Sequence, residues 1–295
     1  MKSLPKFLLA LLISQTCLVI DAISAQQKRA AVVQFLKTFE TRDLSGLSVV
    51  NPDKYIEHNL GVESGFPALR ERVSRIPPGS KVNTVRALVD GDFVILHSEY
   101  QTPQQKTVVF DIFRFESGKI VEHWDNIEDE AATPNPSGRT QLDGPTDVQD
   151  IDKTASNKAL LKEYFEKVVI GGHRELAPNF RGQFHQHNPL GEDNKSGAQA
   201  ASGPFAKPGF VYRVDRVHMI LGEGNFVLVV NEGLFDNKPA SFYDFYRVEN
   251  DKIAEHWDVI RQFLRKKGGK TARANSNEES IMTGDTHNTV STCSV

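Results

Sequence analysis

Two segments of this 295-residue chain carry the same short series of side chains that can exchange protons. His123 and Asp125 stand two positions apart in the first segment, and His256 and Asp258 stand in the same way in the second. Residues two apart in a β-strand point to the same side, so each pair would share one face of a sheet. A carboxyl group buried among apolar residues has a raised pKa and can take a proton from a carbon next to a carbonyl. The pattern indicates acid/base chemistry.

The two pairs belong to a longer internal repeat. Residues 110–125 return as residues 243–258 at a constant offset of 133 positions, without a gap. Upstream, residues 55–59 return as residues 184–188, at an offset of 129 positions. A period above 100 residues indicates two whole domains, because solenoid units run to about 20–50 residues. We therefore expect residues 26–130 and 152–264 to form two related domains.

The remaining segments are predicted from their composition. Lys2 and Lys6 precede an apolar run from residue 7, and small or apolar residues at 23–25 fit a cleavage position. This is typical of a signal peptide, so residues 1–25 are expected to be removed and the protein secreted. Residues 131–151 are rich in proline and glycine and indicate a linker, and residues 265–295 are polar and expected to be disordered. The net charge of −3 argues against nucleic acid or an anionic membrane as the main partner.

Each repeat shows helices first and strands afterwards. Apolar residues at 32, 35, 36 and 39, and again at 161, 164, 165 and 168, follow the spacing of one helix face. Strands are expected at 82–89 and 93–100, with Asp90-Gly91 as the turn, and at 107–115 and 119–127. This order predicts an α+β fold with an antiparallel meander.

The last hairpin of repeat 1 fixes which side chains share a face. A two-residue turn at Ser117-Gly118 would place Glu116 opposite Lys119. Alternation then puts the following residues on the face of Asp125: Phe110, Ile112, Arg114, Val121 and His123. The other face would hold Asp111, Phe113, Phe115, Ile120, Glu122 and Trp124.

These motifs together resemble a known family. A His-Asn pair after an aromatic residue, a strand with His97, and the segment from Asp111 to Asp125 are similar to the SnoaL-like polyketide cyclases of the nuclear transport factor 2-like superfamily. The resemblance covers residues 28–130 and 155–264. It implies two tandem cone-shaped α+β barrels, each with N-terminal helices packed on a curved antiparallel sheet around an apolar pocket.

The resemblance also implies roles for individual residues. Asp125 would face the pocket as acid or base, and this makes its face concave. His123 and His97 would stabilise oxyanion charge. Residues expected to bind the ligand are His58, Asn59, Phe110, Ile112, Arg114, His187, Asn188, His256 and Asp258. Because Val230 replaces His97, repeat 1 is expected to hold the better site. The convex faces would pack together as an internal pseudo-dimer that buries Trp124 and Trp257, and the protein could form a further homo-oligomer.

Other readings of the same residues stay open at this stage. The histidines and Asn59 could serve the fold alone, and three histidines with Asp125 are competent metal ligands. No cofactor or metal is expected, because no short paired-ligand motif accompanies them. Two functions remain in competition. One is cofactor-independent aldol-type cyclisation or isomerisation of a small hydrophobic carbonyl compound. The other is a non-catalytic protein that binds a small ligand or a partner on the same scaffold.

Overall fold

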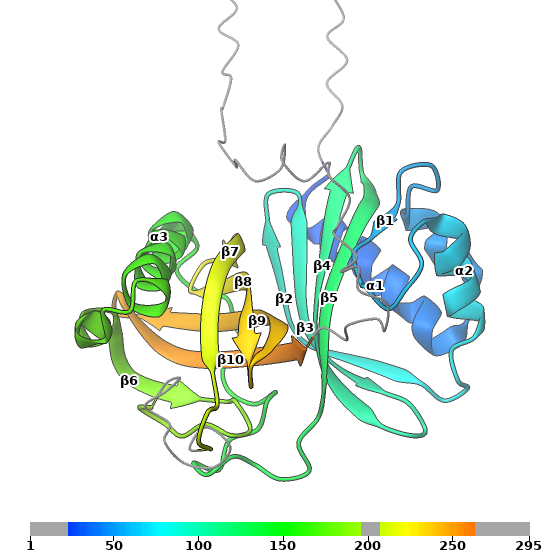
Figure 1. Cartoon of the computed structure of the whole chain (residues 1–295). Coiled ribbons are helices and arrows are strands. Elements are labelled where there is room, and N and C mark those ends of the chain that lie inside the picture. The colour runs from blue at the N-terminus through cyan, green and yellow to red at the C-terminus, as the bar shows by residue number, and fades with distance from the viewer. Residues whose placement is uncertain (1–22, 196–206, 263–295) are drawn as a thin grey trace, which may run out of the picture.

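The computed structural model describes residues 23–195 and 207–262, which form two units of the same architecture (Figure 1). The predicted tail and all but the last residues of the predicted signal peptide lie outside these ranges. Within them, no helix is both long and apolar enough to cross a membrane.

Unit 1 places its helices over one face of a five-stranded sheet. Its elements are α1 (Ala25–Thr41), a 3₁₀ turn (Leu44–Val49), β1 (Ile56–Glu57), α2 (Phe66–Ser74), β2 (Lys81–Asp90), β3 (Phe93–Gln101), β4 (Lys106–Glu116) and β5 (Lys119–Asp129). The strand order is β1-β5-β4-β3-β2, and only β1 runs parallel to its neighbour. Helix α1 begins with a capping box between Ser24 and Gln27.

Unit 2 repeats this plan. It contains α3 (Thr154–Tyr164), which continues as a π-helical stretch (Phe165–Ile170), a 3₁₀ turn (Arg174–Leu176), α4 (Ala177–Phe180), β6 (Arg181–Gln186), β7 (Tyr212–Glu223), β8 (Phe226–Phe235), β9 (Lys238–Glu249) and β10 (Lys252–Gln262). Its strand order, β6-β10-β9-β8-β7, matches that of unit 1. The predicted α+β fold with helices on curved antiparallel sheets is confirmed.

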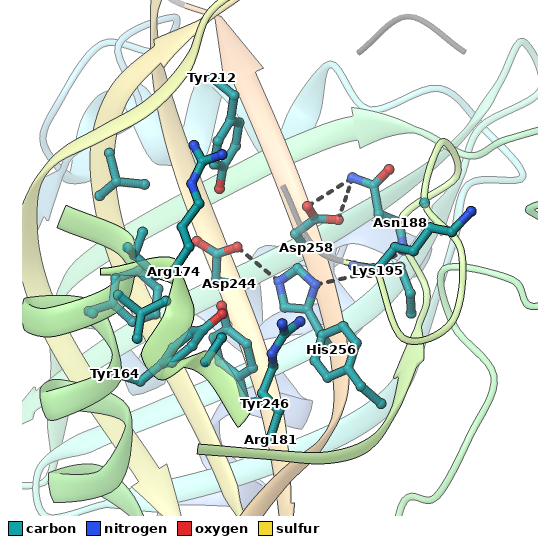
Figure 2. Close-up of a pocket in the computed structure, with 18 of the residues that line it drawn as sticks. Tyr164, Arg174, Arg181, Asn188, Lys195, Tyr212, Asp244, Tyr246, His256 and Asp258 are labelled. Atoms are coloured by element: carbon teal, nitrogen blue, oxygen red, sulfur yellow. Dashed lines mark hydrogen bonds and ion pairs between the residues drawn. The ribbon is translucent and has the colours of Figure 1, made fainter. Parts of the chain in front are cut away.

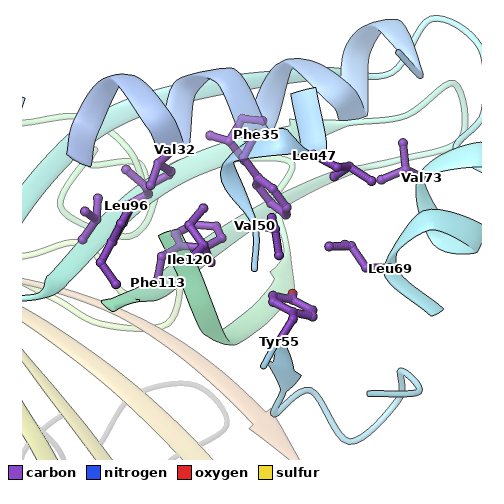
Figure 3. Packing of buried hydrophobic residues seen from close by; sticks show 13 residues of the cluster. Val32, Phe35, Leu47, Val50, Tyr55, Leu69, Val73, Leu96, Phe113 and Ile120 are labelled. Carbon is purple, nitrogen blue, oxygen red and sulfur yellow. The ribbon is translucent and has the colours of Figure 1, made fainter. Parts of the chain in front are cut away.

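Each helix layer closes the core on the concave side of its sheet. In unit 1, Val32 and Phe35 of α1 meet Phe113 and Ile120 of the sheet, with Tyr55 at the edge of the cluster (Figure 3). The rings of Phe35 and Phe113 meet edge to face, with centroids 5.2 Å apart. Burial of such side chains supplies most of the stability of a domain of this size.

A β-bulge changes the face predicted for β4. Glu116 does pair with Lys119, but the register shifts between Arg114 and Phe115, so that Phe113 opposes His123 and Asp111 opposes Asp125. A shift of one residue moves every later side chain to the other face relative to the partner strand. Asp111 and Phe113 therefore share the concave face with His123 and Asp125.

This corrects the prediction that Phe110, Ile112 and Arg114 line the pocket, since all three lie on the outer face of the sheet. Conversely, Phe113 and Phe115 were predicted to be convex and instead belong to the core beneath α1.

The outer faces of the two sheets pack against each other, with the helix layers on the far sides (Figure 1). The shared cluster takes Leu88, Ile95, Val108, Phe110 and Ile112 from unit 1 and Leu221, Phe226, Leu228, Val230, Tyr243, Phe245, Trp257 and Val259 from unit 2. Trp257 is 1% exposed, whereas Trp124 is only partly buried at the margin of the cluster.

Two matching clamps hold the hairpin turns of the units together. The backbone N–H of Val89 donates to Glu223 (2.7 Å), and that of Gly222 donates to Asp90 (2.9 Å). Arg29 forms an ion pair with Glu223, as Lys158 does with Asp90. Val89 and Gly222 are 133 positions apart, as are Asp90 and Glu223. The contact is therefore reciprocal, as expected of an interface between two like surfaces.

The segment between the units packs along this interface. The guanidinium of Arg86 donates to the carbonyls of Leu142, Asp143 and Pro145 and lies 4.3 Å from the centre of the Trp257 ring. Gly144 has φ +92°, and a Cβ there would lie 2.9 Å from the Trp257 ring. Glycine is required at this position both for its backbone conformation and for its close approach.

Candidate functional site

In unit 1, His123 lies between two carboxylates on the concave side of the sheet. Its Nδ1 is 3.0 Å from Glu57, which β1 places beside β5, and its Nε2 is 3.0 Å from Asp111 on β4. Burial by itself lowers the pKa of His123, but the charge of Glu57 and the hydrogen bonds to both carboxylates outweigh it and raise the pKa to about 10. The ring is therefore an imidazolium at neutral pH.

The other polar groups of this site are also paired internally. Asn59 donates to Asp125 (2.5 Å), Tyr55 donates to Glu57 (3.0 Å), and Tyr100 donates to Asp111 (2.9 Å). Burial raises the pKa of Asp125. The concave site of unit 1 is thus a closed network of hydrogen bonds.

In unit 2 the same geometry recurs with one change of charge. His256 Nε2 is 2.9 Å from Asp244, and its Nδ1 is 2.9 Å from Gln186, which stands where unit 1 has Glu57. The Gln186 side-chain oxygen also accepts from the backbone N–H of Asn188 (2.9 Å), so it is the acceptor for the His256 ring. Asn188 in turn donates to both oxygens of Asp258, at 2.9 and 2.8 Å.

A cavity of about 200 Å³ opens beside this group in unit 2 (Figure 2). Asp244, His256 and Asp258 line its sheet wall. The remaining lining includes aromatic side chains (Tyr164, Phe165, Phe184, Tyr212, Tyr246) and basic ones (Arg174, Arg181, Lys195, Arg213). An apolar wall with a few convergent polar groups is typical of a small-molecule site, although this cavity is smaller than the roughly 300–1,000 Å³ that drug-sized ligands occupy.

The pKa of Asp258 makes it the natural proton carrier of this cavity. Burial raises the pKa to about 6, the nearby His256 opposes the rise, and the charge of Asp244 adds to it. The pKa of His256 is raised too: burial lowers it, but the hydrogen bond to Asp244 and the charges of both aspartates prevail. A carboxyl that titrates near neutrality can both accept and return a proton at physiological pH.

Two replacements accompany the cavity in unit 2. Tyr100, which points to the concave side of unit 1, has Gly233 as its counterpart, because both face the equivalent position of the next strand. Val50 bridges to Ile120 in unit 1, and Arg181 pairs with Ile253 at the equivalent place. A tyrosine and a core valine are thus replaced by a glycine and an arginine.

The structure corrects the predicted role of His97. This residue faces away from the concave site, stacks on Phe110 with ring centroids 4.2 Å apart, and receives a hydrogen bond from Arg86 (3.1 Å). Burial and then the charge of Arg86 hold its pKa well below the usual value, so the ring is neutral. Repeat 1 was expected to hold the better site because of His97, and that argument fails.

His58 and His187 also lie on the outer faces, which corrects their prediction as ligand-binding residues. His58 stacks on Trp124 and His187 on Trp257, each with ring centroids 4.4 Å apart. Each ring bonds a glutamate of the last strand, Glu122 at 3.3 Å in unit 1 and Glu255 at 2.8 Å in unit 2. These contacts join the first strand of each unit to its sheet.

The structure keeps six of the candidates on the concave sides: Asn59, His123 and Asp125 in unit 1, and Asn188, His256 and Asp258 in unit 2. Sequence reasoning missed Glu57, Gln186, Asp111 and Asp244 as their partners. A signal was present, because Asp111 returns as Asp244 in the repeated segment. The assumed hairpin register placed Asp111 on the wrong face.

The metal site considered from the sequence would use His58, His97, His123 and Asp125 as ligands, and the structure does not bring these four residues together, because His58 and His97 lie on the outer faces. Among the residues that the structure describes, two other groups have ligand atoms within 4.8 Å of one another: Asp111, His123 and Asp125, and Asp244, His256 and Asp258. In both groups the histidine nitrogens already bond carboxylate or amide oxygens, so a cation would have to displace existing contacts.

Comparison with known proteins gives a match to the SnoaL-like domain family over residues 32–123. A search of curated proteins found no match. Similar solved structures include TsrD from Streptomyces laurentii (18% identity, 36% of this chain and 92% of that one, TM-score 0.33). An LEH-like epoxide hydrolase from M. tuberculosis shows 18% identity over 35% of this chain and 84% of its own, with a TM-score of 0.31. An NTF-2 like protein of unknown function from Burkholderia xenovorans shows 18% identity over 37% and 88%, with a TM-score of 0.32.

Proposed function

We propose, from the geometry of the site and from the match of residues 32–123 to the SnoaL-like domain family, that the protein catalyses proton transfer on a small carbonyl compound without a cofactor, and that the working site is the cavity of unit 2. Aldol-type cyclisation and isomerisation both begin with such a step. The observation that carries the proposal is Asp258, a buried carboxyl with a pKa of about 6 on the wall of a cavity.

The roles follow from the geometry. Asp258 takes the proton from carbon, and Asn188 holds the carboxyl in place through two hydrogen bonds. His256, fixed between Gln186 and Asp244, supplies positive charge next to the enolate that forms. The aromatic wall excludes water, which strengthens these interactions. In unit 1, Asp125 and His123 remain a second candidate pair, because they occupy the equivalent positions.

The test is deuterium exchange at carbons next to the carbonyl in a panel of small ketones and oxo acids, followed by proton NMR in D₂O. Asp258→Asn should lower the exchange rate about 10²–10⁴-fold, the usual contribution of one positioned acid/base group. Asp125→Asn, run in parallel, shows whether unit 1 contributes. Exchange that persists unchanged in Asp258→Asn would refute the assignment to unit 2.

A second candidate function is a non-catalytic small-ligand-binding or interaction protein. The closed network of unit 1 favours it, because there the same residue types serve to bond one another. If saturating ligand binds the intact protein while no compound in the panel exchanges deuterium, this second function is the correct one.

We also propose that the two units act as an internal pseudo-dimer. The reciprocal clamps at Asp90 and Glu223 and the shared apolar cluster support this arrangement. Such a chain needs no second copy to cover its sheets. Light scattering coupled to size-exclusion chromatography tests whether a further homo-oligomer forms.

Export after removal of the N-terminal segment is likewise a proposal. Cleavage after Ala25 would remove Ser24, whose capping box begins α1, at a cost of about 1 kcal/mol. Mass spectrometry of the secreted protein would give the cleavage site. An intact N-terminus in a purely intracellular fraction would contradict export.

A further inference from the structure

A side chain from the segment between the units binds the backbone at the edge of the unit 2 sheet. Within the described chain, β6 pairs with β10 alone, so its other edge is free. The side-chain amide of Asn135 donates to the carbonyls of Gln186 (2.6 Å) and Asn188 (3.2 Å) along that edge. The side chains of the same two residues bind His256 and Asp258. Asn135 therefore holds the backbone that carries both partners of the acid/base pair.

Asn135 is itself fixed in a tight turn. It is 5% exposed, and its side-chain oxygen accepts from the backbone N–H groups of Ser137 and Arg139, both at 3.0 Å. Its own N–H donates to the carbonyl of Arg139 (2.8 Å), and its carbonyl accepts from the N–H of Gly138 (2.8 Å). The side-chain amide thus uses both of its donors and its acceptor. A buried polar group that is fully bonded in this way keeps one orientation.

Two neighbouring residues of the segment between the units support the same stretch of backbone. Arg139 forms an ion pair with Asp193 (2.8 Å), and Asp193 accepts from the N–H of Gln186 (3.0 Å). The ring of His187 donates to the carbonyl of Thr140 (2.8 Å). Residues 135–140 therefore contact residues 186–188 through several independent bonds, and Asn135 makes the two that lie closest to the acid/base pair along the chain.

In unit 1 the equivalent stretch is held from within its own loop. The N–H of Glu57 donates to the hydroxyl of Ser64 (2.9 Å), and the carbonyl of Asn59 accepts from the N–H of Val62 (3.0 Å). Among the residues with described positions, no side chain from outside this loop bonds the carbonyl of Glu57 or that of Asn59. Support from a separate segment is therefore particular to unit 2, where the cavity lies.

We propose that Asn135 is a positioning residue of the unit 2 site, which keeps Gln186 in place to bind His256 and Asn188 in place to bind Asp258. This inference rests on the proposed function and adds to it a residue from the segment between the units. Asn188 donates to both oxygens of Asp258, so a displacement of its backbone weakens both bonds. Misplacement of a catalytic group by about 1 Å can slow a reaction about 10²-fold.

The experiment compares Asn135→Ala with Asn157→Ala in the full chain. Asn157 of α3 is also buried and also donates to a backbone carbonyl, that of Gly224 (2.9 Å), but it does not line the cavity. Both variants lose a buried hydrogen bond, so both should melt at a lower temperature. Only Asn135→Ala should lower kcat for deuterium exchange, by at least about tenfold. Its KM should change less than about twofold, because the lost support acts on the transition state.

A second measurement does not require turnover. Burial is the main cause that raises the pKa of Asp258, and the hydrogen bond from Asn188 is one of the contacts that lower it. In Asn135→Ala the pKa of Asp258, titrated by NMR, should therefore rise by about half a unit to one unit, and in Asn157→Ala it should not move. If Asn135→Ala proves unstable, Asn135→Asp keeps the oxygen that accepts in the turn, loses the donor, and should slow exchange in the same way.

An Asn135→Ala variant that loses only melting temperature, with kcat and the pKa of Asp258 at the parent values, would overturn the proposal. Equal losses of kcat in both alanine variants would overturn it as well, because they would reflect a general loss of packing. The proposed function fails separately. If the parent protein exchanges no compound of the panel, a pKa change confined to Asn135→Ala still supports the positioning role. Exchange that depends on Asp258 but not on Asn135 refutes this inference alone.

Discussion

Glu57→Gln gives the Nδ1 atom of His123 the same kind of neutral acceptor that His256 has in unit 2, because Gln186 stands at the position equivalent to Glu57. The change leaves an oxygen to accept from His123 and from the backbone N–H of Asn59, as Gln186 does for its own partners. It removes the negative charge of Glu57, which is the main cause that raises the pKa of His123 to about 10.

The size of the effect follows from this exchange of a charged for a neutral acceptor. Hydrogen bonds to charged groups contribute about 1.5–3 kcal/mol and neutral ones about 0.5–1.5, and each pKa unit corresponds to about 1.4 kcal/mol. Glu57→Gln should therefore lower the pKa of His123 by about one unit. The reciprocal variant Gln186→Glu should raise the pKa of His256 by a similar amount.

The consequence for stability has a definite sign. The folded-state pKa of His123 lies above the unfolded value of about 6.5, so its contribution is fully present below pH 6.5 and is lost as pH rises through about 10. In Glu57→Gln the folded-state pKa is lower, so this contribution is smaller and is lost completely at a lower pH, and the variant should be less stable than the parent at neutral pH and up to about pH 9. Titration of the histidine ring signals by NMR, with urea unfolding at each pH, measures both quantities. A His123 pKa near 6.5 in the parent protein, or one unmoved by the variant, would refute the reasoning.

Other predictions follow from the interface and the cavity. Glu223→Ala and Asp90→Ala each remove the acceptor of a backbone N–H and one ion pair, so each should lower the free energy of unfolding by about 1–3 kcal/mol in urea titrations. A much larger loss for one than for the other would contradict a reciprocal interface. The exchange rate per enzyme should rise with pH through about 6 as Asp258 loses its proton, and a rate that falls over this range would exclude Asp258 as the base. Treatment with EDTA should leave both exchange and melting temperature unchanged, since the nitrogens of His123 and His256 are already hydrogen-bonded; activity lost to EDTA and restored by one cation would instead reveal a metal site.

Periodicity sufficed to predict the architecture. Apolar residues such as Val32 and Phe35 repeat at helical spacing. The turn between β2 and β3 is present, but it consists of Gly91 and Asp92, one position after the predicted Asp90-Gly91. The repeat at 133 positions anticipated two sheets with the same strand order. These features depend on local sequence, which explains why they could be recognised without coordinates.

The composition of the site could not be predicted in the same way, because it depends on register. One bulge beside Phe115 moves Asp111 to the concave face and Phe110 to the interface. The place of His97 was decided by the partner sheet, which buries it against Phe245 of the other unit, with ring centroids 6.0 Å apart. Contacts between the two units produce no periodic pattern in the sequence of either repeat, so they could not be predicted from it.

The preference for unit 2 likewise arises from long-range pairing. Arg181 becomes notable only once its pairing with Ile253 aligns it with Val50 of the other unit. The sequence offsets of 129 and 133 positions do not predict that Arg181 corresponds to Val50, because the connecting segments of the two repeats differ in length.

Titration of the Asp258 side-chain carboxyl by carbon-detected NMR tests the central claim most directly. The burial of this group and the charge of Asp244 predict a pKa of about 6, and an added compound of the panel that exchanges deuterium should change it. A carboxyl that titrates at its ordinary value of 3.8 and ignores the ligand would contradict the assignment of proton transfer to this cavity.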